Sequence, residues 1–170
     1  MAQLLGTADD LLSTLLKTKA LLASLSGLAE EKAAALQAED IAGLNGLLEK
    51  EEDVILALGE NEAERQAKAR ALAQAAGLSG EKPSLGQIIE AMAEPGCREG
   101  LAEARIGLTE ETARLIRWNT RVKELLQTKI NYTDYMINLL YTPADNGFSY
   151  DMQGNKEEEN GESALLDFRI

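Results

Sequence analysis

Four groups of neighbouring carboxylates are the residues best suited to chemistry, because paired acids can hold metal ions or transfer protons. Di-iron sites in helical bundles place Glu-x-x-His pairs inside the bundle, and this chain contains no His. The lack of His also removes the commonest general base. We therefore predict that these acids form solvated helix faces and that the chain holds no metal. The groups are Glu30-Glu31, Glu49-Glu51-Glu52, Glu110-Glu111 and Glu157-Glu158-Glu159.

Two further motifs offer chemistry at first sight but lack the context for it. Cys97 follows Pro95-Gly96 near an expected helix start, where the helix dipole favours a thiolate, yet no base lies near it in the sequence. A single Cys also cannot form an internal disulfide. The turn around Gly80 and Lys82 is only faintly similar to a phosphate-binding loop, because its glycine spacing is wrong and no strand precedes it. We expect no enzymatic activity and no cofactor.

Composition and charge indicate a soluble helical protein with an acidic surface. The 170 residues are 45% apolar but only 4% aromatic, and Ala, Leu, Glu, Lys and Gln dominate, as in long helices and bundles. The net charge of -12 repels phosphate backbones and anionic membranes, so we expect neither nucleic acid nor a membrane as a partner. We find no run of about 18 apolar residues for membrane insertion and no signal peptide. These observations predict a cytoplasmic protein.

One long stretch, from Leu101 to Tyr141, is the helix against which we expect the other helices to pack. It contains no Pro and one interior Gly, Gly107, and its apolar residues alternate at steps of three and four, the spacing of a coiled-coil seam. Two seam positions are charged, Glu111 and Lys129. A stripe of this length requires other long helices beside it. The apolar seam residues are Leu101, Ala104, Leu108, Leu115, Trp118, Val122, Leu125, Tyr132, Met136 and Leu139, widened by Leu126, Ile130, Ile137 and Leu140.

Two long helices are expected before this stretch. The first covers residues 4–38 and carries Leu on a face broad enough for a bundle of three or more helices. Asp40 is suited to cap the next helix, although a bend at Gly43 or Gly46 fits as well. That second helix runs to about Ala76 and stops at Gly77. Its expected apolar face consists of Ile41, Leu44, Leu48, Ile55 and Leu58.

A short helix follows the second long one. Ser84 is suited to cap it, and Pro95-Gly96 ends it. Because the connections are short, neighbouring helices can run antiparallel. The predicted fold is therefore all-α: an elongated antiparallel helical bundle or coiled coil of three long helices, with the short helix plugging one end and an extended C-terminal tail. The apolar residues of the short helix are Leu85, Ile88, Ile89 and Met92.

The chain beyond Thr142-Pro143 has a different character, because Pro ends the long helix. From Thr142 to Ile170 there are seven acids and two bases, a net charge of 2 − 7 = −5, and such a segment cannot fold alone. We expect residues 1–142 to form the helical bundle domain and residues 143–170 a flexible acidic arm. Apolar anchors in the arm can bind a partner by folding on contact, or pack back on the bundle as a cap. These anchors are Phe148, Tyr150, Met152, Leu165, Leu166, Phe168 and Ile170.

The whole arrangement resembles the flagellar export chaperones of the FlgN family. Four features carry the similarity: the Leu-rich first helix Leu4–Leu36, the pair Lys50-Glu51, a motif in the last helix and a turn after it. The motif is Leu115-Ile116-Arg117-Trp118-Asn119-x-x-Val122-x-x-Leu125-Leu126, and the turn is Tyr150-x-x-x-Gly154. Such proteins are small, acidic, cytoplasmic and largely helical, without enzymatic activity.

The resemblance implies a chaperone for the hook–filament junction proteins of the flagellum, FlgK and FlgL. It would keep these hook-associated proteins from assembling early and deliver them to export-gate components of the type III export apparatus. Their terminal helices form coiled coils on assembly, and a helical chaperone can offer such helices a substitute apolar groove. We expect the partner-binding residues where the last helix ends and in the arm: Tyr132, Met136, Leu139, Leu140, Phe148, Tyr150, Leu165, Leu166 and Phe168.

Two other classes of protein stay open. A structural coiled-coil scaffold would form a homo-oligomer without a client, by pairing Leu115, Val122 and Leu125 with a second copy. Light scattering across a dilution series separates this scaffold from a chaperone. A helical-bundle enzyme or metalloprotein is the third class, and the missing His weighs against it. Metal analysis of the purified protein tests that class.

Overall fold

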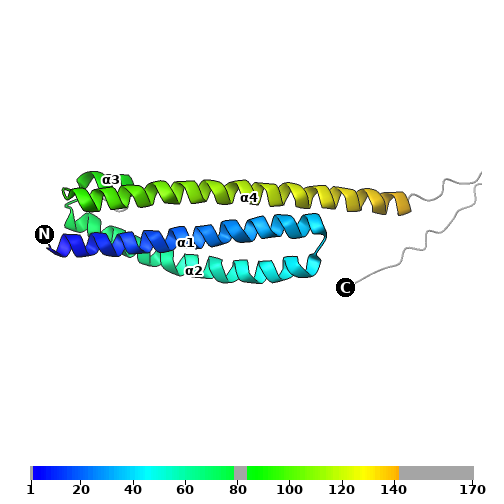
Figure 1. Cartoon of the computed structure of the whole chain (residues 1–170), viewed down its shortest axis with the longest axis horizontal. Coiled ribbons are helices and arrows are strands. Elements are labelled where there is room, and N and C mark those ends of the chain that lie inside the picture. The colour runs from blue at the N-terminus through cyan, green and yellow to red at the C-terminus, as the bar shows by residue number, and fades with distance from the viewer. Residues whose placement is uncertain (1, 79–83, 142–170) are drawn as a thin grey trace, which may run out of the picture. The chain divides into compact units, whose positions relative to one another are not determined.

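Four α-helices make up the protein in the computed structural model, which describes residues 2–78 and 84–141. They are α1 (Ala2–Ala38), α2 (Ile41–Ala75), α3 (Leu85–Ala91) and α4 (Pro95–Tyr141) (Figure 1). The prediction of an all-α protein with three long helices and a short one is confirmed. The chain divides into two compact units, Met1–Lys129 and Ile130–Ile170. The predicted arm, residues 143–170, lies outside the described residues.

Backbone hydrogen bonds define the turn between α1 and α2. The Asp40 amide donates to the Ala35 carbonyl at 3.0 Å and the Glu39 amide to the Leu36 carbonyl at 3.4 Å, the pattern of a Schellman cap. Glu39 adopts the left-handed conformation that this cap needs, with φ 60°. The Asp40 side chain then accepts from the Gly43 amide at 2.8 Å and caps α2. The chain therefore bends at Asp40, the first of the two predicted positions, and not at the glycines inside α2.

α2 ends in the same motif, here with a glycine. Gly77 has φ +75°, and its amide donates to the Gln74 carbonyl at 3.1 Å. The Leu78 amide donates to the Ala73 carbonyl at 2.9 Å, which completes the cap. Gly77 is therefore the stop that the sequence indicates, because glycine reaches a positive φ without a side-chain clash.

α3 begins as predicted, and α4 begins earlier than predicted. Ser84 and Gln87 form a capping box, in which each side chain accepts from the other residue's amide. α4 starts at Pro95 rather than near Leu101. Pro suits the first position of a helix, because the amide hydrogen it lacks would have no partner there.

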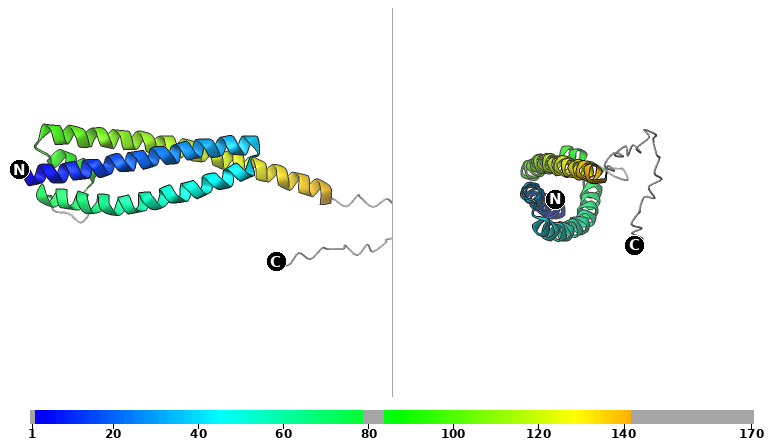
Figure 2. Two further views of the ribbon diagram at one scale, coloured as in Figure 1. Left: turned by 60° about the horizontal axis from the view of Figure 1, so that its bottom comes forward. Right: turned by 90° about the vertical axis from the view of Figure 1, so that its right-hand side faces the viewer.

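Within the first unit, α2 runs antiparallel to α1, and α4 runs parallel to α1 (Figure 2). Residue numbers rise on α1 as they fall on α2, whereas they rise together on α1 and α4. The contacts that fix these directions are Thr14–Asn61 and Lys32–Glu51 between α1 and α2, and Glu30–Arg114 and Glu39–Lys129 between α1 and α4.

Two clusters of buried side chains hold the first unit together. The larger joins α1, α2, α3 and α4, so α3 plugs the core as predicted; it includes Leu11, Leu15, Leu72, Ile88, Met92, Leu101 and Ala104. The smaller joins α1 to α4 through Ala33, Leu36 and Val122, with Leu44, Trp118 and Leu125 packed against it. The single Trp is half-buried and packs against the smaller cluster, and the seam of α4 contributes to both clusters between Leu101 and Leu125.

The predicted apolar face of α2 is wrong in three of its five residues. Ile41, Leu48 and Ile55 are 63%, 47% and 53% exposed. Leu44 and Leu58 are half-buried, as expected. The apolar spacing of α2 therefore indicated a face that lies beside the buried one.

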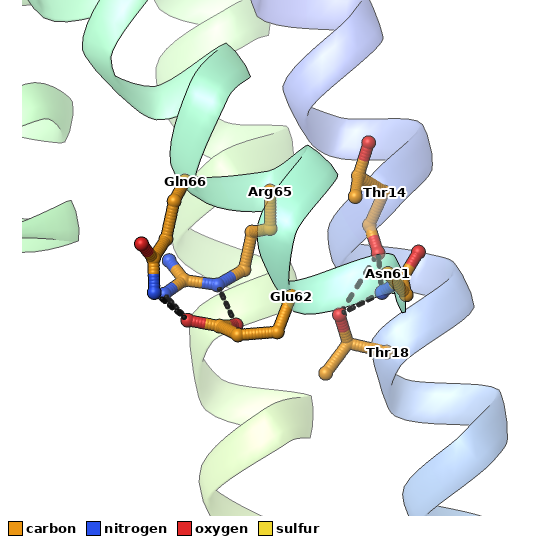
Figure 3. Close-up of polar contacts among 6 residues, drawn as sticks. All are labelled: Thr14, Thr18, Asn61, Glu62, Arg65 and Gln66. Atoms are coloured by element: carbon orange, nitrogen blue, oxygen red, sulfur yellow. Dashed lines mark hydrogen bonds and ion pairs between the residues drawn. The ribbon is translucent and has the colours of Figure 1, made fainter. Parts of the chain in front are cut away.

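Polar residues explain this error, because they occupy inward positions of α2. Lys32 of α1 is only 6% exposed, and its ammonium group lies 2.6 Å from a carboxylate oxygen of Glu51. Asn61 is 1% exposed and donates to the Thr14 carbonyl at 3.3 Å and to the Thr18 hydroxyl at 2.7 Å (Figure 3). These bonds offset the cost of removing polar groups from water.

α1 is long and apolar enough, over Leu5–Ala38, to cross a membrane by length and composition alone. This differs from the expectation based on uninterrupted apolar runs, because scattered polar residues still leave a high mean hydropathy. Leu11, Leu15, Leu25 and Ala29 of this helix are buried in the first unit. Part of the helix is therefore covered by the rest of the first unit, and core helices of soluble proteins pass the same test of length and composition.

Candidate binding surface

The last part of α4, residues 130–141, exposes apolar side chains along its whole length, and we call it the exposed segment. Each of its residues is exposed. Tyr132 is 63% exposed, Met136 38%, Leu139 54% and Leu140 79%. Contiguous apolar surface of this kind usually marks an interaction site.

The seam spacing that buries α4 in the first unit continues through the exposed segment. Leu101 and Val122 hold seam positions and are 1% and 8% exposed. Tyr132 and Met136 continue the same steps of three and four but stay exposed to water. Complete burial of a large apolar side chain contributes roughly 1.5–3 kcal/mol, so a partner that covers several of them gains substantial binding energy.

All four helix residues predicted to bind a partner lie on the exposed segment. The structure adds further exposed residues that the prediction did not include: Ile130, Tyr135, Ile137 and Tyr141. The two tyrosines were missed because the prediction followed one seam, whereas residues on every side of the helix are exposed in this segment. The five remaining predicted residues lie outside the described residues: Phe148, Tyr150, Leu165, Leu166 and Phe168.

Cys97 is not set up as a nucleophile. Burial raises the pKa of its thiol, and the nearby carboxylates of Asp9 and Glu94 raise it further. These effects oppose the thiolate that a helix start would favour, so the thiol stays protonated at neutral pH. Within residues 2–78 and 84–141, no group of three or more His, Cys, Asp or Glu residues is placed to hold a metal ion.

Among the described residues, the carboxylates in the predicted solvated groups are exposed with two exceptions, and Glu157, Glu158 and Glu159 lie outside the described residues. Glu51 is half-buried and pairs with Lys32. Glu111 occupies its seam position with one carboxylate oxygen, Oε2, buried and without a hydrogen-bond partner among the described residues. The exposed members are Glu30, Glu31, Glu49, Glu52 and Glu110. Neither exception brings a second acid and a base together, so neither forms an acid–base site.

Two small hollows lie along α4. One, of about 470 Å³, is lined by apolar residues including Leu85, Leu108 and Ile116. The other, of about 380 Å³, includes Ile89 and Ile106. Their polar lining consists of Arg105, Glu110 and threonines, and it lacks the convergent nucleophile and base that a catalytic site requires.

The FlgN protein family matches residues 1–158 of the chain, a range that contains every described helix. The chain belongs to the FlgN family. No curated protein and no solved structure matches it in the same comparisons. FlgN-family proteins are flagellar export chaperones that bind hook-associated proteins, and they are not enzymes.

The family match also bears on the residues predicted to bind a partner, because its range includes all of the exposed segment, residues 130–141. The family match extends into the predicted arm as far as residue 158, so it includes Phe148 and Tyr150 and stops before Leu165. It also includes the pair Lys50-Glu51, whose carboxylate holds the buried Lys32.

Proposed function

We propose that this FlgN-family protein is a cytoplasmic export chaperone for the hook–filament junction proteins FlgK and FlgL. It holds a client helix on the exposed segment of α4 and prevents premature assembly. It then delivers the client to export-gate components of the flagellar type III export apparatus. The observation that carries the proposal is the exposure of apolar side chains over residues 130–141.

The spacing of the exposed segment supports a helical client. Tyr132, Met136 and Leu139 follow one another at four and three residues, the pattern by which two amphipathic helices pack together. Tyr135 and Tyr141 add large rings with a polar tip, which are common at the energetic centres of interfaces. A client helix that forms coiled coils can bury these apolar side chains by packing against them.

The acidic arm would add further anchors for the same client. Its support is its composition: a net charge of −5 excludes independent folding, whereas apolar residues at both ends allow folding on contact. We propose that the apolar residues of the arm bind the same client by folding on contact. The anchors are Phe148, Tyr150, Leu165, Leu166 and Phe168.

A pair of matched double variants tests the binding surface. Leu139→Asn with Leu140→Asn removes two exposed aliphatic side chains from the exposed segment. Ile106→Asn with Ile116→Asn removes two that are 61% and 60% exposed elsewhere on α4. Calorimetric titration with a purified FlgK-type client should show about tenfold or greater weakening for the first pair and less than about twofold for the second. Equal affinities for both pairs would rule out the exposed segment as the client site.

The alternative hypothesis of a self-associating scaffold requires residues that pack inside the first unit. Val122 is 8% exposed and packs with Ala33 and Leu36 of α1, and Leu125 packs against the same cluster. Leu115 is half-buried. A second copy that paired with Val122 and Leu125 would have to displace the α1 residues that pack against them.

A further inference from the structure

A row of exposed aliphatic side chains runs along α2, away from the exposed segment in sequence. Ile41, Leu48 and Ile55 recur every seven residues, and Leu56 follows them. Their exposed fractions are 63%, 47%, 53% and 63%. Because seven residues make nearly two helical turns, the first three lie on one face, and at ~1.5 Å per residue the row is about 22 Å long. We name these four residues the α2 row.

Acidic residues border the α2 row. Glu49, Glu52 and Asp53 are exposed. Glu52 follows Leu48 by four residues and precedes Ile55 by three, which places it beside both on the helix surface. Residues 41–60 contain five acids and one base, a net charge of 1 − 5 = −4. An apolar strip with this border complements a helix that carries basic residues beside its own apolar stripe.

We propose that the α2 row is a docking surface for an amphipathic helix of another protein, with Lys or Arg next to its apolar residues. About four turns of such a helix, roughly 15 residues, match the length of the row. The apolar contacts supply affinity, and the opposite charges set orientation and speed association. This surface shares no residue with the proposed client site, and its proposal does not depend on that site.

Charge argues against a second copy as the occupant. Two α2 rows laid together would bring two segments of net charge −4 into contact, and like charges across an interface oppose binding. The chain as a whole carries -12, so close approach of two copies is opposed at long range as well. A helix that carries Lys or Arg is instead attracted by the negative charge of the chain.

Two synthetic peptides of about 16 residues probe the row in calorimetric titrations against the full chain. Both place Leu at helical spacing; one carries Lys beside the Leu stripe and the other carries Glu at the same positions. We expect the Lys peptide to bind and the Glu peptide to bind at least about tenfold more weakly. The variant Leu48→Gln with Ile55→Gln keeps every charge and should weaken the Lys peptide about tenfold or more.

A control variant separates this surface from the client site. Leu139→Gln with Leu140→Gln should leave Lys-peptide affinity within about twofold of wild type. Equal binding to wild type and to the Leu48→Gln, Ile55→Gln variant would overturn the proposal, as would weakening by the control variant alone. If the control variant loses binding of a FlgK-type client, that result supports the proposed client site. It does not bear on the α2 row, which is tested by the affinity for the Lys peptide alone.

Two checks keep the test decisive. If the double variant melts below wild type, Leu56→Gln replaces it, because that side chain is 63% exposed, and the Lys peptide should again bind more weakly. Sedimentation of the full chain tests whether a second copy of the chain binds the α2 row. A wild-type dimer that becomes monomeric in the Leu48→Gln, Ile55→Gln variant would identify a second copy on the row and overturn the proposal.

Discussion

Glu39 occupies a backbone conformation at the end of α1 that usually belongs to glycine. Gly77 fills the equivalent position after α2, with a similar hydrogen-bond pattern. The Glu39 carboxylate also accepts a hydrogen bond from the Lys129 ammonium group of α4, and this bond lowers the pKa of Glu39. Backbone strain and an exposed ion pair therefore meet at one residue.

We predict that Glu39→Gly raises the melting temperature by about 2–4 °C, because it relieves left-handed strain and loses only an exposed ion pair. Differential scanning calorimetry measures the shift. Glu39→Ala loses the same ion pair but keeps a Cβ in the strained conformation, so it should show no such gain. A melting temperature that falls in Glu39→Gly would mean that the ion pair outweighs the strain.

Glu62 is held in its ionised form by side chains of its own helix. The Nε and Nη2 groups of Arg65 donate to its two oxygens at 2.6 Å each, and Gln66 donates at 2.8 Å (Figure 3). The Arg65 hydrogen bonds are the main cause of the lowered pKa of Glu62, and partial burial opposes them. A carboxylate whose folded pKa is lowered contributes stability above its unfolded pKa and loses that contribution as pH falls through the folded value.

Glu62→Gln should therefore cost stability only where the carboxylate is ionised. At pH 7 we predict a loss of a few tenths of a kcal/mol to about 1 kcal/mol, because the pair is partly exposed to water. The difference from wild type should shrink as pH falls below about 4.3 and vanish once the folded carboxyl is protonated. Urea unfolding at pH 7, 5 and 3 measures it, and a difference that is the same at all three values would refute the assigned cause.

At the scale of elements, two glycines in and after α2 should respond oppositely to the same change. Gly59 lies inside the helix with open space where a Cβ would stand, whereas Gly77 has φ +75°. Gly59→Ala should raise the free energy of unfolding by about 0.5–1 kcal/mol, because Ala restricts the unfolded chain and favours helix. Gly77→Ala should lower it by about 1 kcal/mol through strain. Shifts of the same sign in chemical unfolding would show that the cap at Gly77 does not form.

Three of the helix ends could be predicted from the sequence because their signals are local, whereas Pro95-Gly96 was expected to end the short helix and instead begins α4. Asp40, Ser84 and Gly77 each act on amides or carbonyls within a few residues, and the structure confirms all three. The buried face of α2 could not be predicted, because Glu51 and Asn61 face inward only by virtue of partners on α1. Their polarity made an exposed row of aliphatic residues look like the core face.

The candidate surface could be predicted only in part for a similar reason. The seam spacing placed Tyr132, Met136 and Leu139 on one stripe, but spacing does not show which residues of the stripe are buried and which are exposed. α4 has 47 residues against 37 in α1 and 35 in α2, and its seam pattern is the same where the residues are buried and where they are exposed. Tyr135 and Tyr141 became visible only with the exposure of that final stretch.

On the whole molecule, the exposed segment and the α2 row differ in the charge of the residues near them, and we propose a different partner for each. The exposed segment follows a stretch of α4 rich in Arg and Lys, whereas the α2 row lies among acids. Salt should therefore weaken binding of a basic helix to the α2 row, because screening reduces the attraction between opposite charges.

Removal of residues 143–170 should separate the predicted arm from the helices. Helicity and melting temperature should stay nearly unchanged, because the described core lies in residues 2–129. Capture of a FlgK-type client should weaken, because the arm's apolar anchors are gone. Circular dichroism and a pull-down with the full and shortened chains make the comparison. Full capture by the shortened chain would refute the role of the arm.

Hydrogen exchange measured with and without client shows whether a client helix binds at residues 130–141. Every residue from 130 to 141 has an exposed side chain, so the amides of this helical stretch should exchange readily in the free protein. With a saturating FlgK-type client we predict that their exchange slows by about tenfold or more, as a packed partner suppresses local opening. A saturated complex in which residues 130–141 exchange at the rate of the free protein would contradict the account.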